Sequence, residues 1–293
     1  MSLQVDALLR TRAVSRSRQL RNQAVTVSTY AAFLIAAIPL FLVVVAVVRK
    51  AAGVISPGFF WKDLPIQARS PEGGIGPAVV GTIVTAGLAT LIAVPIGILA
   101  AVYLNEYGGK SRLARVIRFL SDVMAGVPSI VMGLFIFTIW VLRFKERSAL
   151  AGALALACLM LPVVIRSAES MLRLVPSELR EASYALGTRK SRTILSIVLP
   201  TAAPGIVSGA LLAVARAAGE TAPLLFTIGI AYSKNFSLSG ENTALSTQIF
   251  SNASTSFPAA QERAWAAALT LMALVVILST AARIVTARFT RRV

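Results

Sequence analysis

Residues 79–104 read VVGTIVTAGLATLIAVPIGILAAVYL and contain no charged side chain. A helix needs about 20 mostly apolar residues to cross a hydrocarbon core about 30 Å thick. Backbone polar groups inside lipid must be hydrogen-bonded within their own segment, and this run shows none of the alternation that is typical of a strand. The stretch therefore predicts a transmembrane helix.

Five further apolar runs flank this one, and the chain is 56% hydrophobic and only 14% charged. Such a composition excludes an ordinary soluble domain. The fourth run along the chain is the shortest and contains Pro162, and its inner end could extend through Arg166. We therefore expect an all-α integral membrane protein with six transmembrane helices. The five further runs cover residues 25–48, 119–142, 149–165, 205–230 and 264–285.

The charge balance is strongly basic, with 29 Lys and Arg residues against 12 Asp and Glu and a net charge of +17. The basic residues lie between the apolar runs, which suits anchors beside anionic lipid better than a folded nucleic-acid surface. Because Lys and Arg resist translocation, the side that holds most of them should be cytoplasmic. That side includes the N-terminus, the C-terminus and the connections after the second and fourth runs. Three residues oppose this assignment: Arg143, Lys145 and Arg147.

Several kinds of site are excluded by the residues that the chain lacks. With no His and with Cys158 as its one Cys, the chain cannot form a conventional multi-ligand zinc site or an intrachain disulfide. Gly109-Lys110-Ser111 matches the end of a phosphate-binding P-loop, but the position of the first glycine is Leu104, inside a predicted helix. We therefore expect no nucleotide site, metal or cofactor in this chain, and no nucleophile–base pair indicates an enzyme.

Two connections on the outer side are longer than the others. Residues 56–76 are rich in Pro and Gly around Phe59, Phe60 and Trp61, a pattern typical of an interfacial anchor. Residues 231–262 are rich in Ser, Asn and Thr. Three interpretations of this second connection remain open: a docking site for a partner, a re-entrant or interfacial segment, and a solvated connection.

The connection after the fourth run is the most informative part of the sequence. Residues 178–200 read ELREASYALGTRKSRTILSIVLP. Pro176 and Ser177 suit the start of a short helix, acidic residues follow in its first turn, and Gly187 suits its end. The apolar residues of this helix share one stripe, which predicts that either a partner groove or lipid covers it. The stripe consists of Leu179, Ala182, Ala185 and Leu186.

Three stretches resemble a known family. Glu181-Ala182-Ser183, followed by Gly187 and Pro200, resembles the EAA loop of bacterial ABC importer permeases, with Ser183 where a second Ala is usual. GVPSIVMGLF at 126–135 and ARAAGETAPLLFT at 215–227 resemble the PstA-type permeases of phosphate importers. The resemblance extends from about residue 74 to the C-terminus, and it implies the type I ABC importer permease fold.

The resemblance also implies partners and a domain organisation. The partners are a PstC-like second permease, a PstB-like ATPase dimer that binds ATP and Mg, and a PstS-like extracytoplasmic phosphate-binding protein. The chain itself would lie in the bacterial plasma (inner) membrane. Its parts would be a cytoplasmic basic tail at 1–24, a first transmembrane helix at 25–48, a permease core at 75–286 with a cytoplasmic coupling loop at about 173–200, and a cytoplasmic tail at 287–293.

Contact with the ATPase is assigned by the resemblance to one part of this loop. The segment from Glu181 to Gly187 would form a coupling helix that seats in a cleft of the ATPase and transmits its closure. The residues expected there are Arg180, Glu181, Ala182, Leu186 and Gly187.

An arginine within the fifth apolar run predicts an anion pathway. Arg216 costs roughly 2.5–3.5 kcal/mol to place at membrane depth, so it should face protein or water. Glu220 lies four residues on, on the same face of the helix, while Gly219 and Pro223 permit a local break. We expect Arg216 to contact passing phosphate and Glu220 to hold it, with a self-neutralised structural pair as the alternative. Arg166 at the inner mouth is a second candidate, unless it snorkels to the headgroups.

Other cargoes and mechanisms fit part of these observations. Sulfate, molybdate and phosphonate permeases share the EAA-like loop, but the stretch at 216–223 favours phosphate. A self-contained channel or a secondary transporter would work without an ATPase. Gly205 and Gly209 form a small-xxx-small patch, which predicts close helix packing either inside the chain or at a subunit interface.

Overall fold

The computed structural model describes residues 16–290, and this part of the chain is helical with no strand. The predicted tails at 1–24 and 287–293 therefore fall partly outside the described residues. The elements are α2 (Arg16–Ala51), α3 (Gly76–Val102), η1 (Tyr103–Tyr107), α4 (Arg112–Gly126), α5 (Ser129–Ile136), η2 (Phe137–Val141), α6 (Leu142–Phe144), α7 (Ala149–Arg173), α8 (Ser177–Ala185), α9 (Lys190–Thr193), η3 (Ile194–Val198), α10 (Leu199–Ala218), α11 (Ala222–Thr227), α12 (Leu245–Ala253) and α13 (Pro258–Thr290).

The chain divides into two compact units, residues 1–49 and residues 50–293. The first unit is formed by α2, which contains the predicted 25–48 segment and is long and apolar enough to cross a membrane. Its central residues are apolar on every side of the helix, which is typical of a helix surrounded by lipid.

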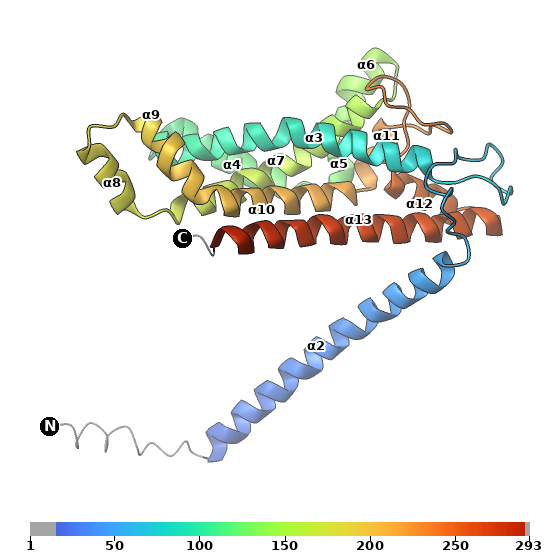
Figure 1. Cartoon of the computed structure of the whole chain (residues 1–293), viewed down its shortest axis with the longest axis horizontal. Coiled ribbons are helices and arrows are strands. Elements are labelled where there is room, and N and C mark those ends of the chain that lie inside the picture. Colours follow the sequence, from blue (N-terminus) through green and yellow to red (C-terminus); the bar gives the residue numbers. More distant parts are fainter. Residues whose placement is uncertain (1–15, 291–293) are drawn as a thin grey trace. The chain divides into compact units, whose positions relative to one another are not determined.

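The second unit is a bundle in which α7 packs against both α3 and α10, and α13 packs against the other side of α10 (Figure 1). The predicted segments 79–104, 149–165 and 264–285 lie inside helices that are long enough to span a bilayer. The fourth segment does continue past Arg166, because α7 ends only at Arg173. Its first turn is closed by Ser148, whose hydroxyl accepts a hydrogen bond from the backbone N–H of Ala151 at 3.2 Å.

The third predicted segment, 119–142, differs from a straight span. The helix bends by 106° between α4 and the α5–α6 stretch, and the two together qualify as one span. Val127 adopts an extended conformation with ψ of 131° immediately before Pro128. A proline lacks the N–H that would continue the helix and disfavours helical geometry in the residue before it, which explains the break. With this bent pair counted as one span, residues 16–290 contain six candidate spans, the number predicted; without it they contain five.

The fifth predicted segment, 205–230, is displaced along the chain. The helical stretch begins at Lys190 and ends at Ala218, and a separate short helix, α11, follows. The break lies at Gly219 to Thr221, and Pro223 stands in the first turn of α11, as the Gly-Pro spacing predicted. Hydropathy alone does not mark the start of this stretch, because residues 190–193 are all basic or polar.

Within residues 16–290, three turns of π-helix occur in or beside the spans: η1 ends the α3 span, η2 lies between α5 and α6, and η3 precedes α10. Gly109-Lys110-Ser111, which matches only the end of a P-loop, follows η1. Gly109 there has a positive φ of 46°, and the Ser111 hydroxyl accepts a hydrogen bond from Ala114 N at 3.1 Å. This stretch is therefore the turn and N-cap that start α4.

The connections at 56–76 and 231–262 contain buried residues and a helix. Phe59 is buried in a core cluster, so the predicted anchor at 56–76 keeps only Trp61 as a strongly exposed aromatic. Arg263 at the start of α13 is buried and donates to the backbone oxygens of Ser70 and Ala68, which fixes the end of this loop. The 231–262 connection contains α12, whose first turn is buried, so it is not merely solvated.

Candidate transport pathway and coupling surface

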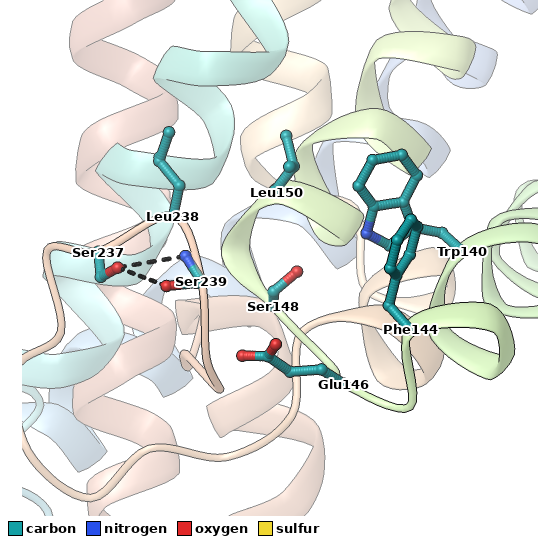
Figure 2. A pocket seen from close by; sticks show the side chains of 8 residues that line it. All are labelled: Trp140, Phe144, Glu146, Ser148, Leu150, Ser237, Leu238 and Ser239. Atoms are coloured by element: carbon teal, nitrogen blue, oxygen red, sulfur yellow. Dashed lines mark hydrogen bonds between the residues drawn. The ribbon is translucent and has the colours of Figure 1, made fainter.

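A pocket of about 460 Å³ lies where the turn before α7 meets the 231–244 stretch (Figure 2). Trp140 and Phe144 form one wall, with ring centroids 4.8 Å apart, and the Glu146 carboxylate lines the pocket on the side away from these rings (Figure 2). The Glu146 carboxylate accepts a hydrogen bond from Gly240 N. The charged group that lines this pocket is a carboxylate, which repels anions, so the pocket is a poor site for phosphate. The volume of a pocket therefore does not identify the anion pathway.

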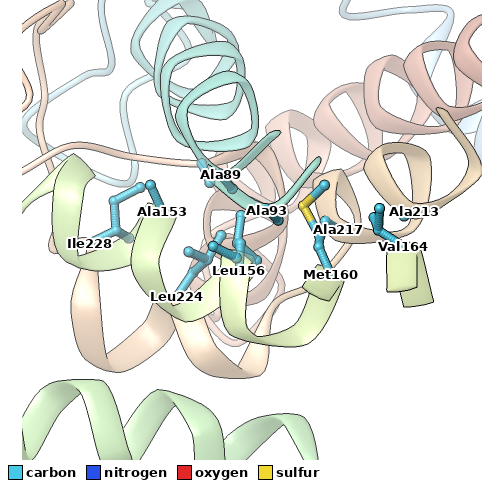
Figure 3. Close-up of a cluster of buried hydrophobic side chains, with 12 residues drawn as sticks. Ala89, Ala93, Ala153, Leu156, Met160, Val164, Ala213, Ala217, Leu224 and Ile228 are labelled. Carbon is cyan, nitrogen blue, oxygen red and sulfur yellow. The ribbon is translucent and has the colours of Figure 1, made fainter. Parts of the chain in front are cut away.

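The helices around the predicted pathway are held together by small side chains. Ala89 and Ala93 of α3 pack with Leu156 and Met160 of α7 and with Ala217 of α10 in one buried cluster (Figure 3). Alanines allow the helix axes to approach closely, so the last turn of α10 is closely packed against α3 and α7.

The Gly205 and Gly209 patch serves packing inside the chain. A Cβ atom added to Gly209 would stand 2.6 Å from the Ser167 hydroxyl, and one added to Gly205 would stand 2.2 Å from the sulfur of Met171. Both contacts join α10 to α7. The intramolecular alternative for this patch is therefore correct.

Arg216 lies in the last turn of α10, and Glu220 lies within the break that follows. Arg216 Nε and Glu220 Oε1 are 3.7 Å apart, and the Arg216 side chain remains 74% exposed. The Glu220 backbone oxygen accepts a hydrogen bond from the Ser246 hydroxyl at 2.8 Å, which ties this turn to α12. The hollow beside the pair measures about 10 Å³, room for a single water, so an oxyanion would meet the open face of the guanidinium.

Arg166 is engaged by another helix. Its guanidinium pairs with the Asp122 carboxylate of α4, and both side chains are about half exposed. The carboxylate paired with Arg166 is that of Asp122, whereas the one nearest Arg216 is that of Glu220. The structure therefore places the two predicted arginines in separate contacts on α7 and α10.

A buried carboxylate next to Arg166 was missed by the sequence analysis. Glu169 Oε1 accepts from Arg118 Nε at 3.0 Å and from Arg173 Nη2 at 2.6 Å. Arg118 Nη2 also donates to Leu104 O at 2.9 Å, so one arginine of α4 joins α7 to the end of the α3 span. The four-residue spacing of Glu169 and Arg173 was visible in the sequence. The partner on α4, 51 positions away from Glu169, was not.

The predicted short helix after α7 is present as α8. It follows Pro176, ends at Ala185, and is stopped by Gly187, whose φ of +74° suits glycine. Its apolar stripe is exposed, with Leu186 86% exposed and Leu179 also exposed, and Glu181 beside the stripe is exposed as well. Ser183 is buried instead, and its hydroxyl lies 2.8 Å from that of Thr193 in α9. The described part of the chain leaves this apolar stripe uncovered.

Arg180 points away from that stripe. Its guanidinium donates to the backbone oxygens of Leu172 and Val175 at 3.0 and 2.7 Å and to Glu106 Oε1 at 2.9 Å. Arg180 therefore holds α8 to the bundle, whereas Glu181 and Leu186 stay available to a partner.

Together these features define a multi-spanning membrane protein whose exposed apolar helix is displayed at one end of a tightly packed bundle. Within the described residues, no group of three or more metal-ligating side chains occurs. Residues 93–292 match the family described as binding-protein-dependent transport system inner membrane component. The chain belongs to this family of transport components, and it is a multi-pass protein of the plasma (inner) membrane.

Curated relatives narrow the family further. The phosphate transport system permease protein PstA 1 of Mycobacterium tuberculosis (strain H37Rv) is 43% identical over 286 residues, which cover 96% of this chain and 92% of that protein. PstA of Mycobacterium leprae is 45% identical over 269 residues (90% and 88%), and PstA of Yersinia pestis is 41% identical over 271 residues (92% and 92%). The chain therefore belongs to the PstA family of permease proteins.

A solved structure agrees with the fold. A chain of the inward-facing MetNI methionine ABC transporter superposes with a TM-score of 0.54 over 75% of this chain and 94% of that chain, at 20% identity. At this identity the likeness concerns the fold alone. The predicted type I ABC permease fold is confirmed.

Proposed function

We propose that this chain is the permease subunit of an ATP-driven importer that moves inorganic phosphate inward by alternating access. The proposal is supported by the PstA relatives, whose similarity extends over about nine tenths of the chain or more. The observation that carries it is the open face of Arg216 at the break in α10, because an unshielded guanidinium in a span needs a negative partner. Both termini are proposed to be cytoplasmic.

Arg216 is proposed to contact the phosphate oxygens during passage. A planar guanidinium offers two parallel N–H donors to an oxyanion. The Glu220 carboxylate, 3.7 Å from Arg216 Nε, is too distant to occupy these donors, so they remain available to phosphate. The same carboxylate repels the anion, which shortens its stay at the site. Arg166 is proposed as a later contact at the inner mouth, where phosphate would compete with Asp122 for the guanidinium.

Energy is proposed to enter through α8 from a separate PstB-like ATPase dimer that binds ATP and Mg. An apolar side chain as exposed as that of Leu186 favours a groove on a partner, and Glu181 adds a charge beside it. Gly187 ends the helix at the point where the chain must turn back towards α9. The remaining partners proposed are a PstC-like permease and a PstS-like binding protein at the outer face.

The test of the cargo contact is Arg216→Gln in the complex reconstituted in proteoliposomes with its second permease, ATPase and binding protein. We expect uptake of radiolabelled phosphate to fall by at least about tenfold while the subunits still co-purify, because a neutral amide cannot pair with the oxyanion. Arg69→Gln, an exposed arginine in the outer 56–76 loop, is the matched control and should leave uptake unchanged. Undiminished uptake by Arg216→Gln would falsify the contact, and uptake of sulfate or molybdate in place of phosphate would overturn the cargo.

A further inference from the structure

The last turn of the α3 span carries a carboxylate that is nearly inaccessible. Glu106 lies in the π-helical turn η1, and its side chain is only 5% exposed. One of its oxygens, Oε1, accepts from Asn105 Nδ2 at 2.7 Å and from Arg180 Nη2 at 2.9 Å. A charge buried this deeply is strongly destabilising unless it is paired, so the contact with Arg180 is a fixed one.

The other partners of Arg180 make this contact a junction of three elements. The same guanidinium donates to Leu172 O in α7 and to Val175 O just beyond it. Arg180 itself belongs to α8. One side chain thus joins the exposed helix to the end of α7 and to the end of the α3 span.

A second cation reaches the same turn from the far side of the loop. Lys190, the first residue of α9, donates from Nζ to the backbone oxygen of Glu106, and its ammonium lies 4.8 Å from the centroid of the Tyr107 ring. Residues 106 and 107 therefore hold both arms of the loop, α8 through Arg180 and α9 through Lys190.

We propose that Glu106 is a positioning residue that transmits movement of α8 to the α3 span, through its buried pair with Arg180. The inference rests on the proposed coupling function of α8. The helix is joined covalently to α7 and, through α9, to α10, but the chain gives it no direct covalent connection to α3. A buried pair resists displacement far more than an exposed one, so a push on α8 moves the inner end of α3 in the same step. Because α3 packs along α7, this pair connects the ATPase face to the centre of the bundle.

The experiment measures phosphate taken up per ATP hydrolysed by the reconstituted complex. Glu106→Gln keeps the shape of the side chain and removes the charge, and Glu72→Gln in the outer loop is the control. For Glu106→Gln we expect normal co-purification of the ATPase, continued ATP hydrolysis, and an uptake-to-hydrolysis ratio that falls on the order of tenfold, within the usual range of a coupling energy. An unchanged ratio would overturn the proposal. If the melting temperature also fell, the pair of Glu106 with Arg180 would be a purely structural contact.

A double-mutant cycle tests whether the effect belongs to the pair. If Glu106 acts through Arg180, then Glu106→Gln combined with Arg180→Gln should lower the ratio little more than Arg180→Gln alone. Multiplicative losses would show independent roles and refute the link.

Charge reversal at Glu181 distinguishes a failure of this link from a failure of the proposed coupling role of α8. If Glu181→Lys has no effect, the coupling role of α8 fails; if only Glu106→Gln has no effect, the link alone fails.

Discussion

The hydroxyl pair that joins α8 to α9 makes an asymmetric prediction about two substitutions. Ser183 and Thr193 are both buried, and their hydroxyl oxygens lie 2.8 Å apart. Thr193 has a second acceptor, Arg189 O at 3.3 Å, whereas Ser183 has no other side-chain hydrogen bond among the described residues. Removing one partner is therefore not equivalent to removing the other.

Ser183→Ala leaves Thr193 with its backbone acceptor, so we expect a loss of about 0.5–1 kcal/mol in the local stability of the loop. Thr193→Val leaves the Ser183 hydroxyl buried without a partner, which costs about 1–3 kcal/mol. The double variant replaces both polar groups by apolar ones and should be less destabilised than Thr193→Val alone.

Hydrogen exchange of the α8 amides in the detergent-purified chain measures these differences directly. Because 1.4 kcal/mol corresponds to a factor of ten, Ser183→Ala should speed exchange roughly 2- to 5-fold and Thr193→Val roughly 5- to 150-fold. Amides of α7 serve as the internal reference. Equal effects of the two single variants, or additive effects in the double variant, would refute the reasoning.

Two further substitutions test packing and coupling. Gly209→Val should lower the melting temperature in detergent by roughly 2–12 °C, because the new side chain meets Ser167 in a packed helix contact. Gly87→Val should be nearly neutral, because a Cβ atom added there would meet no atom within 4 Å beyond its own stretch of helix, and equal shifts would contradict the packing argument. Glu181→Lys should reduce co-purification of the ATPase and phosphate uptake together, because it reverses a charge beside the apolar stripe of α8, whereas normal values of both would remove α8 from the interface.

Much of the fold follows from residue chemistry that acts over one helix. The apolar runs locate the spans, and Pro176 and Gly187 set the limits of α8. The 106° bend in the third span was missed because hydropathy has no direction: residues 119–142 are equally apolar whether or not the helix turns at Pro128. The start of the fifth helical stretch at Lys190 was missed for the opposite reason, since a helix end outside the hydrocarbon need not be apolar.

The candidate site was predicted only where its partners are close in sequence. Arg216 and Glu220 are four residues apart, and their pairing was predicted from that spacing. The partner of Arg180 lies 74 positions away, so its inward direction depends on how α8 packs and could not be read from the stripe. Ser183 shows the same limit: beside the EAA pattern it looks like a small departure, and only the fold reveals that Thr193 faces it.

The turns of π-helix at η1, η2 and η3 have a consequence for how such a bundle can change shape. Each wider turn holds about one residue more than an α-helical turn, so the faces before and after it are out of phase by about 100°. Tightening one of these turns would swivel the remainder of its span about its own axis and lengthen it slightly, while every backbone group kept a bonding partner. A span can thus rotate by gaining or losing one extra residue in a π-helical turn, and no hinge has to expose main-chain polar groups to lipid.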